Sequence, residues 1–112
     1  VFHRVIDGFM AQTGDPTGTG RGGSKLPDVP AEFSSVPFER GTVGAARSQN
    51  PNSANSQFFI MFAPAPHLNG QYTVVGTVES GMEHLHAIKK GSRAANGAVQ
   101  EPDRMIKVRV ED

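Results

Sequence analysis

Glycine and proline divide this chain into short segments, and this restricts its possible folds more than any other feature. Residues 14–37, GDPTGTGRGGSKLPDVPAEFSSVP, contain five glycines and four prolines. Proline lacks the backbone N–H that helices and central strands need, and glycine weakens both kinds of element. This segment is therefore predicted to be a long, ordered surface loop, with the regular structure on either side of it.

Short apolar runs outside this loop have the pattern of β-strands. Residues 1–6 and 9–12 flank Asp7-Gly8, a dipeptide typical of tight turns, and therefore predict a hairpin. β-branched and aromatic residues with turn signals between them predict three further strands, at residues 42–46, 57–62 and 72–78.

The last third of the chain predicts the one helix. Residues 80–91, SGMEHLHAIKKG, repeat apolar side chains at helical spacing, with Ser80 as the cap and Gly91 at the end, over about three turns. Residues 106–110 alternate apolar and charged side chains, which predicts a half-buried final strand. Many short strands with one helix indicate a mainly β protein, a closed or nearly closed β-barrel.

Length and charge limit the classes of function. A chain of 112 residues forms one domain, residues 1–112, with its own core. Basic and acidic residues number 11 each, so no net charge attracts nucleic acid or an anionic membrane. The chain has no cysteine and therefore no thiolate zinc site, and no apolar run reaches the roughly 18 residues of a membrane helix. A binding function must come from a local site.

Strand alternation collects polar side chains on one face of the predicted sheet. Arg4 shares a face with two apolar neighbours, Met10 goes with Gln12, and Gln57 goes with Phe59. An apolar floor with a few donors suits a ligand groove. An arginine on a strand also fits a solvated face or a partner for a carboxylate, so periodicity alone leaves both interpretations open.

Other motifs are weak. GTGRGGS lacks the Lys-Ser/Thr ending of a phosphate-binding loop, and a single Arg-Gly-Gly at zero net charge is poor evidence for RNA binding. His84 and His86 lie two residues apart, whereas a zinc helix places its pair four apart. We therefore predict no metal and no nucleic-acid partner.

Three blocks resemble the cyclophilins, the cyclophilin-type peptidyl-prolyl cis/trans isomerases, and small bacterial members most of all. The blocks are FHRVIDGFMAQTGDPTGTGRGG, GTVGAARSQNPNSANSQFFI and HLNGQYTVVGTVESGM, in the family's order. The resemblance implies an antiparallel β-barrel with one C-terminal helix. The family's first two strands and first helix have no counterpart in this chain. We therefore expect either a fragment of a longer protein or a chain that a partner completes.

The resemblance also implies a site without cofactor or metal. Arg4 matches the family's catalytic arginine, and Gln12 would position it and bind the substrate carbonyl, with Gln57 nearby. By the same resemblance the wall of a proline pocket is formed by Phe9, Met10, Phe59 and Leu68. Arg47 and Ser48 fall where the family offers backbone groups to the peptide before proline, often as Ala and Asn.

Two positions depart from the family pattern. His67 stands where many members have a large aromatic residue that contacts cyclosporin, and Tyr72 stands where many have histidine. We therefore expect proline turnover with weak cyclosporin binding. The expected partners are proline-containing peptides and unfolded or folding proteins, and the expected compartment is the cytoplasm, with the periplasm as the alternative. Two rival functions are a proline-peptide binding module without turnover and a small barrel that encloses an apolar ligand.

Overall fold

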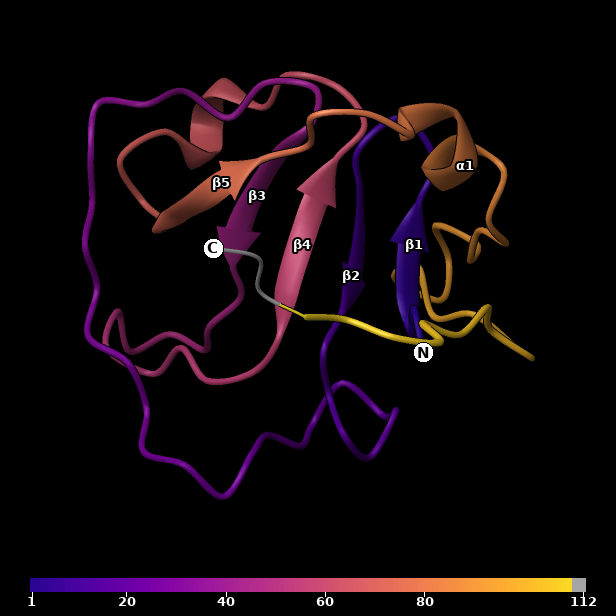
Figure 1. Cartoon of the computed structure of the whole chain (residues 1–112), viewed down its shortest axis with the longest axis horizontal. Coiled ribbons are helices and arrows are strands. Elements are labelled where there is room, and N and C mark those ends of the chain that lie inside the picture. Colours follow the sequence, from indigo (N-terminus) through magenta and orange to yellow (C-terminus); the bar gives the residue numbers. More distant parts are fainter. Residues whose placement is uncertain (110–112) are drawn as a thin grey trace.

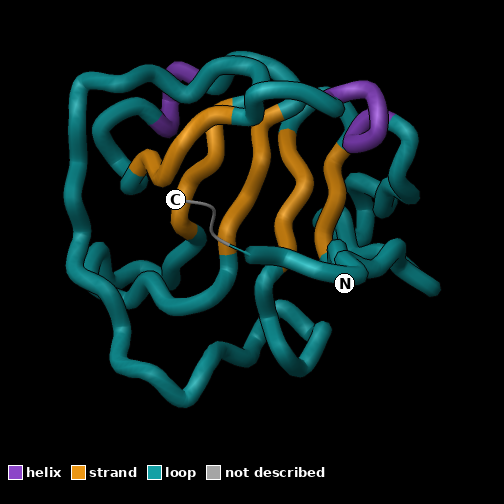
Figure 2. Tube along the Cα trace, in the orientation of Figure 1, coloured by secondary structure: helices purple, strands orange, loops and turns teal. Residues whose placement is uncertain are grey.

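The computed structural model, which describes residues 1–109, consists of one antiparallel five-stranded sheet with long loops and little helix (Figures 1 and 2). The sheet order is β1-β2-β4-β3-β5. Its strands are β1 (Arg4–Ile6), β2 (Met10–Thr13), β3 (Thr42–Ala45), β4 (Phe58–Met61) and β5 (Val74–Thr77). The mainly β class is confirmed. The strands predicted at residues 1–6, 42–46, 57–62 and 72–78 are present with shorter bounds, and the one predicted at 9–12 is shifted by one residue. No helix within these 109 residues has the length and apolarity needed to cross a membrane.

The predicted hairpin is confirmed, with a slightly longer turn. Ile6 lies directly opposite Met10, so the turn holds three residues, 7–9. The Phe9 N–H donates to the Ile6 carbonyl at 3.0 Å, and Gly8 has a φ of 74°. A glycine takes this left-handed conformation without steric cost, which is why the Asp-Gly signal located the turn.

Cross-strand register divides the side chains into two apolar clusters, one on each face of the sheet. Because directly opposite residues point to the same side, Arg4, Gln12 and Phe59 form one row across β1, β2 and β4. The buried cluster on that face consists of Ile6, Met10, Phe38, Phe59, Met61, Ala65 and Leu68. The opposite cluster consists of Val5, Ala11, Ile60, Phe62 and Met82.

The long loop from β2 to β3 runs past one end of the sheet and around β5 (Figure 1). Its first part is built around the buried carboxylate of Asp15, which accepts hydrogen bonds from the backbone N–H groups of Thr17, Thr19, Gly20 and Gly22 at 2.7 to 3.2 Å. Burial by itself raises the pKa of Asp15, but these hydrogen bonds reverse the effect and hold it well below its ordinary value. The loop is therefore ordered by a buried charge.

The predicted helix at 80–91 is wrong in length. Helix α1 spans only Met82–His86, and its N-cap is Gly81, with a φ of 89°, instead of Ser80. Beyond Ile88 the backbone bonds elsewhere: the Lys89 N–H donates to the Asp103 carboxylate, and the Gly91 N–H donates to the Val5 carbonyl on β1. These tertiary hydrogen bonds replace the last turn of the helix that the sequence favoured.

The predicted final strand is also wrong over the residues that the structure describes. Residues 106–109 form no strand, Ile106 is fully exposed and Val108 is 65% exposed; residue 110 lies outside the described range. The outer edge of β1 is already hydrogen-bonded to residues 97–103. Residues 106–109 therefore cannot pair with the edge of β1, which is already occupied.

The sheet has two edges, β1 and β5, which do not pair with each other in residues 1–109. Figure 2 shows the five strands as one open, curved layer. Closure of the predicted barrel therefore stays a prediction.

The first stability prediction concerns Gly44. It lies opposite Phe59, and a Cβ there would come within 2.5 Å of the Phe59 ring and 2.7 Å of the Phe38 ring. We expect Gly44→Ala to lower the free energy of unfolding in urea by about 1 to 3 kcal/mol through overpacking. Gly76→Ala on β5 is the control, because its Cβ would have no atom within 4 Å. Equal effects of the two changes would contradict this account.

The second stability prediction concerns Asp15. An amide places an NH₂ group against several N–H donors, so we expect Asp15→Asn to cost about 1 to 3 kcal/mol in the free energy of unfolding at pH 7. The folded pKa is depressed, so the stabilisation is fully present above the unfolded pKa of about 3.9 and is lost as the pH falls below it. The difference in the free energy of unfolding between wild type and Asp15→Asn should therefore become smaller below about pH 4. The exposed Asp28→Asn is the control, and a pH-independent gap would refute the carboxylate's role.

Candidate active site

The side chain of Arg4, at the start of β1, is held by neutral acceptors. Its Nη1 donates to Gln12 Oε1 at 3.2 Å, its Nε to the Asn96 carbonyl at 2.9 Å and its Nη2 to Asn96 Oδ1 at 3.0 Å. A guanidinium has five N–H donors, so two remain without a partner in residues 1–109. Within that range Arg4 forms no salt bridge. Its charge is therefore fixed in place and available to a ligand.

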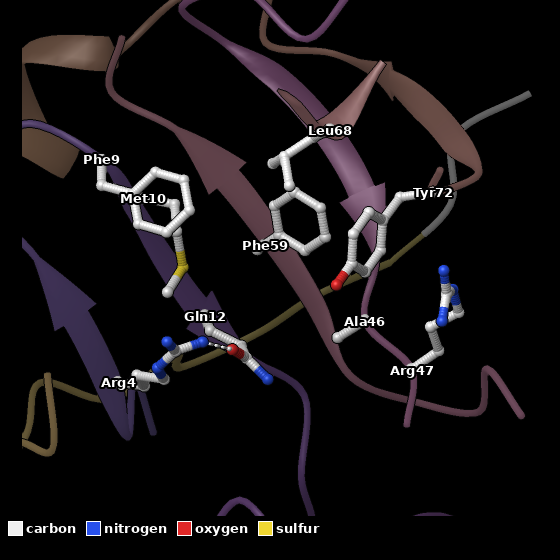
Figure 3. A pocket seen from close by; sticks show the side chains of 9 residues that line it. All are labelled: Arg4, Phe9, Met10, Gln12, Ala46, Arg47, Phe59, Leu68 and Tyr72. Carbon is white, nitrogen blue, oxygen red and sulfur yellow. Dashed lines mark hydrogen bonds between the residues drawn. The ribbon is translucent and has the colours of Figure 1, made fainter. Parts of the chain in front are cut away.

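A chain of amides connects Arg4 to the Asp15 loop. The Gln12 Nε2 donates to Gln57 Oε1 at 2.8 Å, and the Gln57 Nε2 donates to the carbonyls of Gly20 at 3.1 Å and Gly22 at 2.9 Å. Because those carbonyls are acceptors, they orient the Gln57 NH₂ toward the loop and its oxygen toward Gln12. Gln12 in turn presents its own oxygen to the guanidinium, as the dashed line in Figure 3 shows.

His3, the residue before Arg4, adds no second charge at this end of the site. Its pKa is lowered, chiefly by burial, while the Asp15 carboxylate acts in the opposite direction. The imidazole is therefore neutral at pH 7.

Beside the guanidinium lies a cavity of about 130 Å³, which we call the first cavity. It is lined by Arg4, Phe9, Met10, Gln12, Ala46, Arg47, Phe59, Leu68 and Tyr72. In Figure 3 the apolar side chains surround the space, with Arg4 and Gln12 together on one side. Sites for drug-sized ligands measure about 300 to 1,000 Å³, so this volume suits a single side chain.

Aromatic packing sets the shape of the first cavity. The Tyr72 ring stands edge-on to Phe59, with centroids 5.6 Å apart and an angle of 88°. Phe38 stacks on Phe59 at 5.7 Å and also contacts Tyr72 edge-on at 6.5 Å, so the three rings pack against one another. The Arg47 Cζ lies 4.6 Å from the Tyr72 centroid, and its Nη2 donates to the Gln71 carbonyl at 2.7 Å. Arg47 is thus a fixed part of the wall.

Most of the predicted site residues meet at the first cavity. Eight of them line it: Arg4, Phe9, Met10, Gln12, Arg47, Phe59, Leu68 and Tyr72. Phe9 and Met10 are neighbours in sequence, yet both line it because Phe9 belongs to the turn, where strand alternation does not apply.

Three predicted site residues lie elsewhere. Ser48 and Gln57 line a second cavity of about 270 Å³, which shares Gln12, Ala46 and Arg47 with the first. His67 is exposed and lines neither of these two cavities; its ring centroid lies 6.0 Å from that of Phe9. Their binding roles stay predictions.

The sequence interpretation missed two residues at this site. Ala46 lines both cavities, and alternation along residues 42–46 would have placed it on the same face as Gly44. Asn96 binds Arg4 from a loop 92 residues away, and no local pattern signals such a contact. No group of His, Asp or Glu side chains that could hold a metal ion occurs in residues 1–109.

The comparisons with known proteins all point to one family. Residues 1–110 match the family model described as cyclophilin type peptidyl-prolyl cis-trans isomerase/CLD. The chain is 64% identical over 121 residues to a probable peptidyl-prolyl cis-trans isomerase of Brucella abortus, a match that covers 98% of this chain and 62% of the relative. It is 47% identical to human peptidyl-prolyl cis-trans isomerase-like 3, over 80% of this chain and 58% of that protein. The chain thus spans less than two thirds of the length of these curated relatives.

Solved structures give the same result. A cyclophilin type peptidyl-prolyl cis-trans isomerase of Cryptosporidium parvum superimposes with a TM-score of 0.71 at 38% identity, over 76% of this chain and 56% of that one. The same protein in the presence of the dipeptide Ala-Pro matches equally well, at 40% identity. With the family model matched over residues 1–110, the chain belongs to the cyclophilin family.

Proposed function

We propose that this chain accelerates cis/trans isomerisation of the peptide bond before proline. The observation that carries the proposal is the Arg4 guanidinium, with two unused N–H donors, at the polar side of an apolar cavity sized for one side chain. A proline ring fits such a cavity, and its peptide nitrogen then lies on the side of the guanidinium.

The chemistry requires no nucleophile. Rotation of an X-Pro bond faces a barrier of about 18 to 20 kcal/mol because amide resonance is lost at the twisted geometry. The lone pair of the prolyl nitrogen becomes localised there and accepts a hydrogen bond that the planar amide does not accept. A donor aimed at this nitrogen therefore stabilises the transition state more than the ground state. Arg4 suits the role because a guanidinium stays charged at any accessible pH.

The other residues of the first cavity bind and orient. Phe9, Met10 and Phe59 take up the ring by apolar contact, which restricts the peptide to poses in which its nitrogen faces Arg4. Gln12 keeps the guanidinium in position through its Oε1 and offers an amide at the edge of the cavity. These contacts bind the peptide and orient it, and the hydrogen bond from Arg4 accelerates the rotation.

The proposed substrates are proline-containing peptides and unfolded or folding proteins. Support comes from the names of the relatives, each a peptidyl-prolyl cis-trans isomerase or similar to one, and from the Cryptosporidium structure determined in the presence of Ala-Pro. We propose the cytoplasm as the compartment, on the resemblance to small bacterial cyclophilins alone. A barrel that encloses a larger apolar ligand is disfavoured by the small volume of the first cavity.

The finer features of the fold belong to this proposal as well. We propose that the active protein has the closed barrel of its family, with additional structure beside the five-stranded sheet. An exposed apolar side chain supports this: Val75, on the edge strand β5, is 66% exposed. Apolar edges of this kind are usually covered in a functional protein.

The test of the mechanism is Arg4→Ala in an NMR exchange assay on an Ala-Pro peptide. We expect the loss of one preorganised donor to lower kcat/KM by about 2 to 4 kcal/mol of transition-state stabilisation. Arg40→Ala, at an exposed arginine outside the first cavity, is the matched control and should retain full activity. Equal rates for Arg4→Ala and wild type would refute the proposed mechanism. If the wild type binds the peptide without turnover, a binding module is favoured.

Cyclosporin tests the departure at His67. Its imidazole is exposed and adds no wall to the first cavity, so we expect inhibition only at micromolar concentrations or above. His67→Trp should strengthen inhibition, because a larger ring would extend the apolar surface beside Phe9. His84→Trp, at another exposed histidine, serves as the control. Nanomolar inhibition of the wild type would contradict the expectation.

A further inference from the structure

The loop of residues 92–97 is bonded directly to β1, the strand that carries Arg4. The Val5 N–H donates to the Gly97 carbonyl at 2.8 Å, and the Val99 N–H donates to the His3 carbonyl at 3.1 Å. A Cβ at Gly97 would lie 2.5 Å from the Ile6 side chain and 3.2 Å from the Arg4 Cγ, so only glycine permits this close approach. The backbone of the loop is therefore held in register against the arginine.

Asn96 occupies an unusual conformation in this loop. Its φ is 54°, and the only other non-glycine residue with a positive φ among residues 1–109 is Glu101, at 50°. Asparagine tolerates the left-handed region better than most residues, although the conformation still carries a cost for any side chain. Here the geometry lets one residue accept two hydrogen bonds from Arg4, with its carbonyl from Nε and with its Oδ1 from Nη2.

We propose that Asn96 is a positioning residue that sets the angle of the Arg4 guanidinium toward the first cavity. Gln12 alone holds one end of the guanidinium at Nη1 and leaves the plane of the group free to tilt. The two acceptors of Asn96 hold the other edge, so the two unused N–H donors face a fixed direction. This inference rests on the proposed function, because it assigns a role in aiming the donor for the prolyl nitrogen.

The chemistry of the acceptors suits the same role. All three groups that hold Arg4 are uncharged oxygens, from the amide of Gln12 and from the carbonyl and amide of Asn96. A carboxylate in their place would form an ion pair and compete with the substrate for the guanidinium. Neutral amides fix the orientation and leave the full positive charge for the developing lone pair.

The experiment compares Asn96→Gly with wild type in the full 112-residue chain. Glycine keeps the left-handed backbone and the carbonyl acceptor, and it removes the side chain, which carries the other acceptor for Arg4, Oδ1. Because one hydrogen bond to a partly exposed charged group is lost, we expect kcat for an Ala-Pro peptide to fall about 3- to 10-fold with KM within about 2-fold. Glu101→Gly is the matched control, because it also places glycine at a position with positive φ but lies away from the first cavity. It should leave kcat and KM unchanged.

A second readout follows the guanidinium itself and requires no turnover. ¹⁵N NMR measures how fast the Arg4 Nη2 group rotates about its Cζ–Nη bond. The hydrogen bond to Oδ1 should keep this rotation slow in wild type and in Glu101→Gly, and Asn96→Gly should accelerate it. Asn96→Asp, which retains an Oδ acceptor, should restore slow rotation.

The outcomes separate this inference from the proposed function. Unchanged rotation and unchanged kcat in Asn96→Gly, with Arg4→Ala inactive, would overturn the role of Asn96 and leave the enzyme mechanism standing. If the wild type shows no turnover but the Arg4 Nη2 group rotates faster in Asn96→Gly than in wild type, the positioning contact is supported and the proposed activity is refuted. An equal fall of kcat in Glu101→Gly would show that the effect is one of backbone stability, and the inference would fail.

Discussion

The antiparallel register of β1, β2 and β4 is the constraint on which the rest of the site depends. It places Arg4 opposite Gln12 and Gln12 opposite Phe59, so a charge, an amide and an aromatic ring stand in one row on one face. Side chains alternate with a period of two, and a slip of one residue would turn every member of the row to the other face. The register is itself held by burial: Ile6 pairs with Met10, and both are in the core on that face.

Charge is distributed so that the guanidinium keeps its freedom to bind. The buried carboxylate of Asp15 accepts hydrogen bonds from backbone N–H groups of its own loop, and within residues 1–109 it forms no salt bridge with Arg4. Gly20 and Gly22 use their N–H groups on Asp15 and their carbonyls on Gln57, which orients the amide chain that ends at Arg4. The glycine-rich loop thus serves as a rigid support for the site.

The two errors in the fold prediction have a common physical cause. Residues 80–91 have a helical pattern and 106–110 a strand pattern, yet β1 presents unpaired backbone groups that residues 91–103 satisfy instead. A sheet edge in need of hydrogen bonds outweighs the modest local preference for one more turn of helix. The pattern at 106–109 then has no partner there, because strand propensity requires a neighbouring strand.

The sequence by itself determined which side chains share a face within each strand, since alternation along a strand is a local property. The register that aligns Arg4, Gln12 and Phe59 across three strands was decided by the tertiary structure. Resemblance to a family, and not periodicity, supplied Phe9 and Leu68. Only the tertiary structure decided the size of the first cavity and brought Asn96, from the far end of the chain, onto the guanidinium. Contacts of that kind depend on how a loop docks against a strand edge, and no pattern within a few residues encodes the docking.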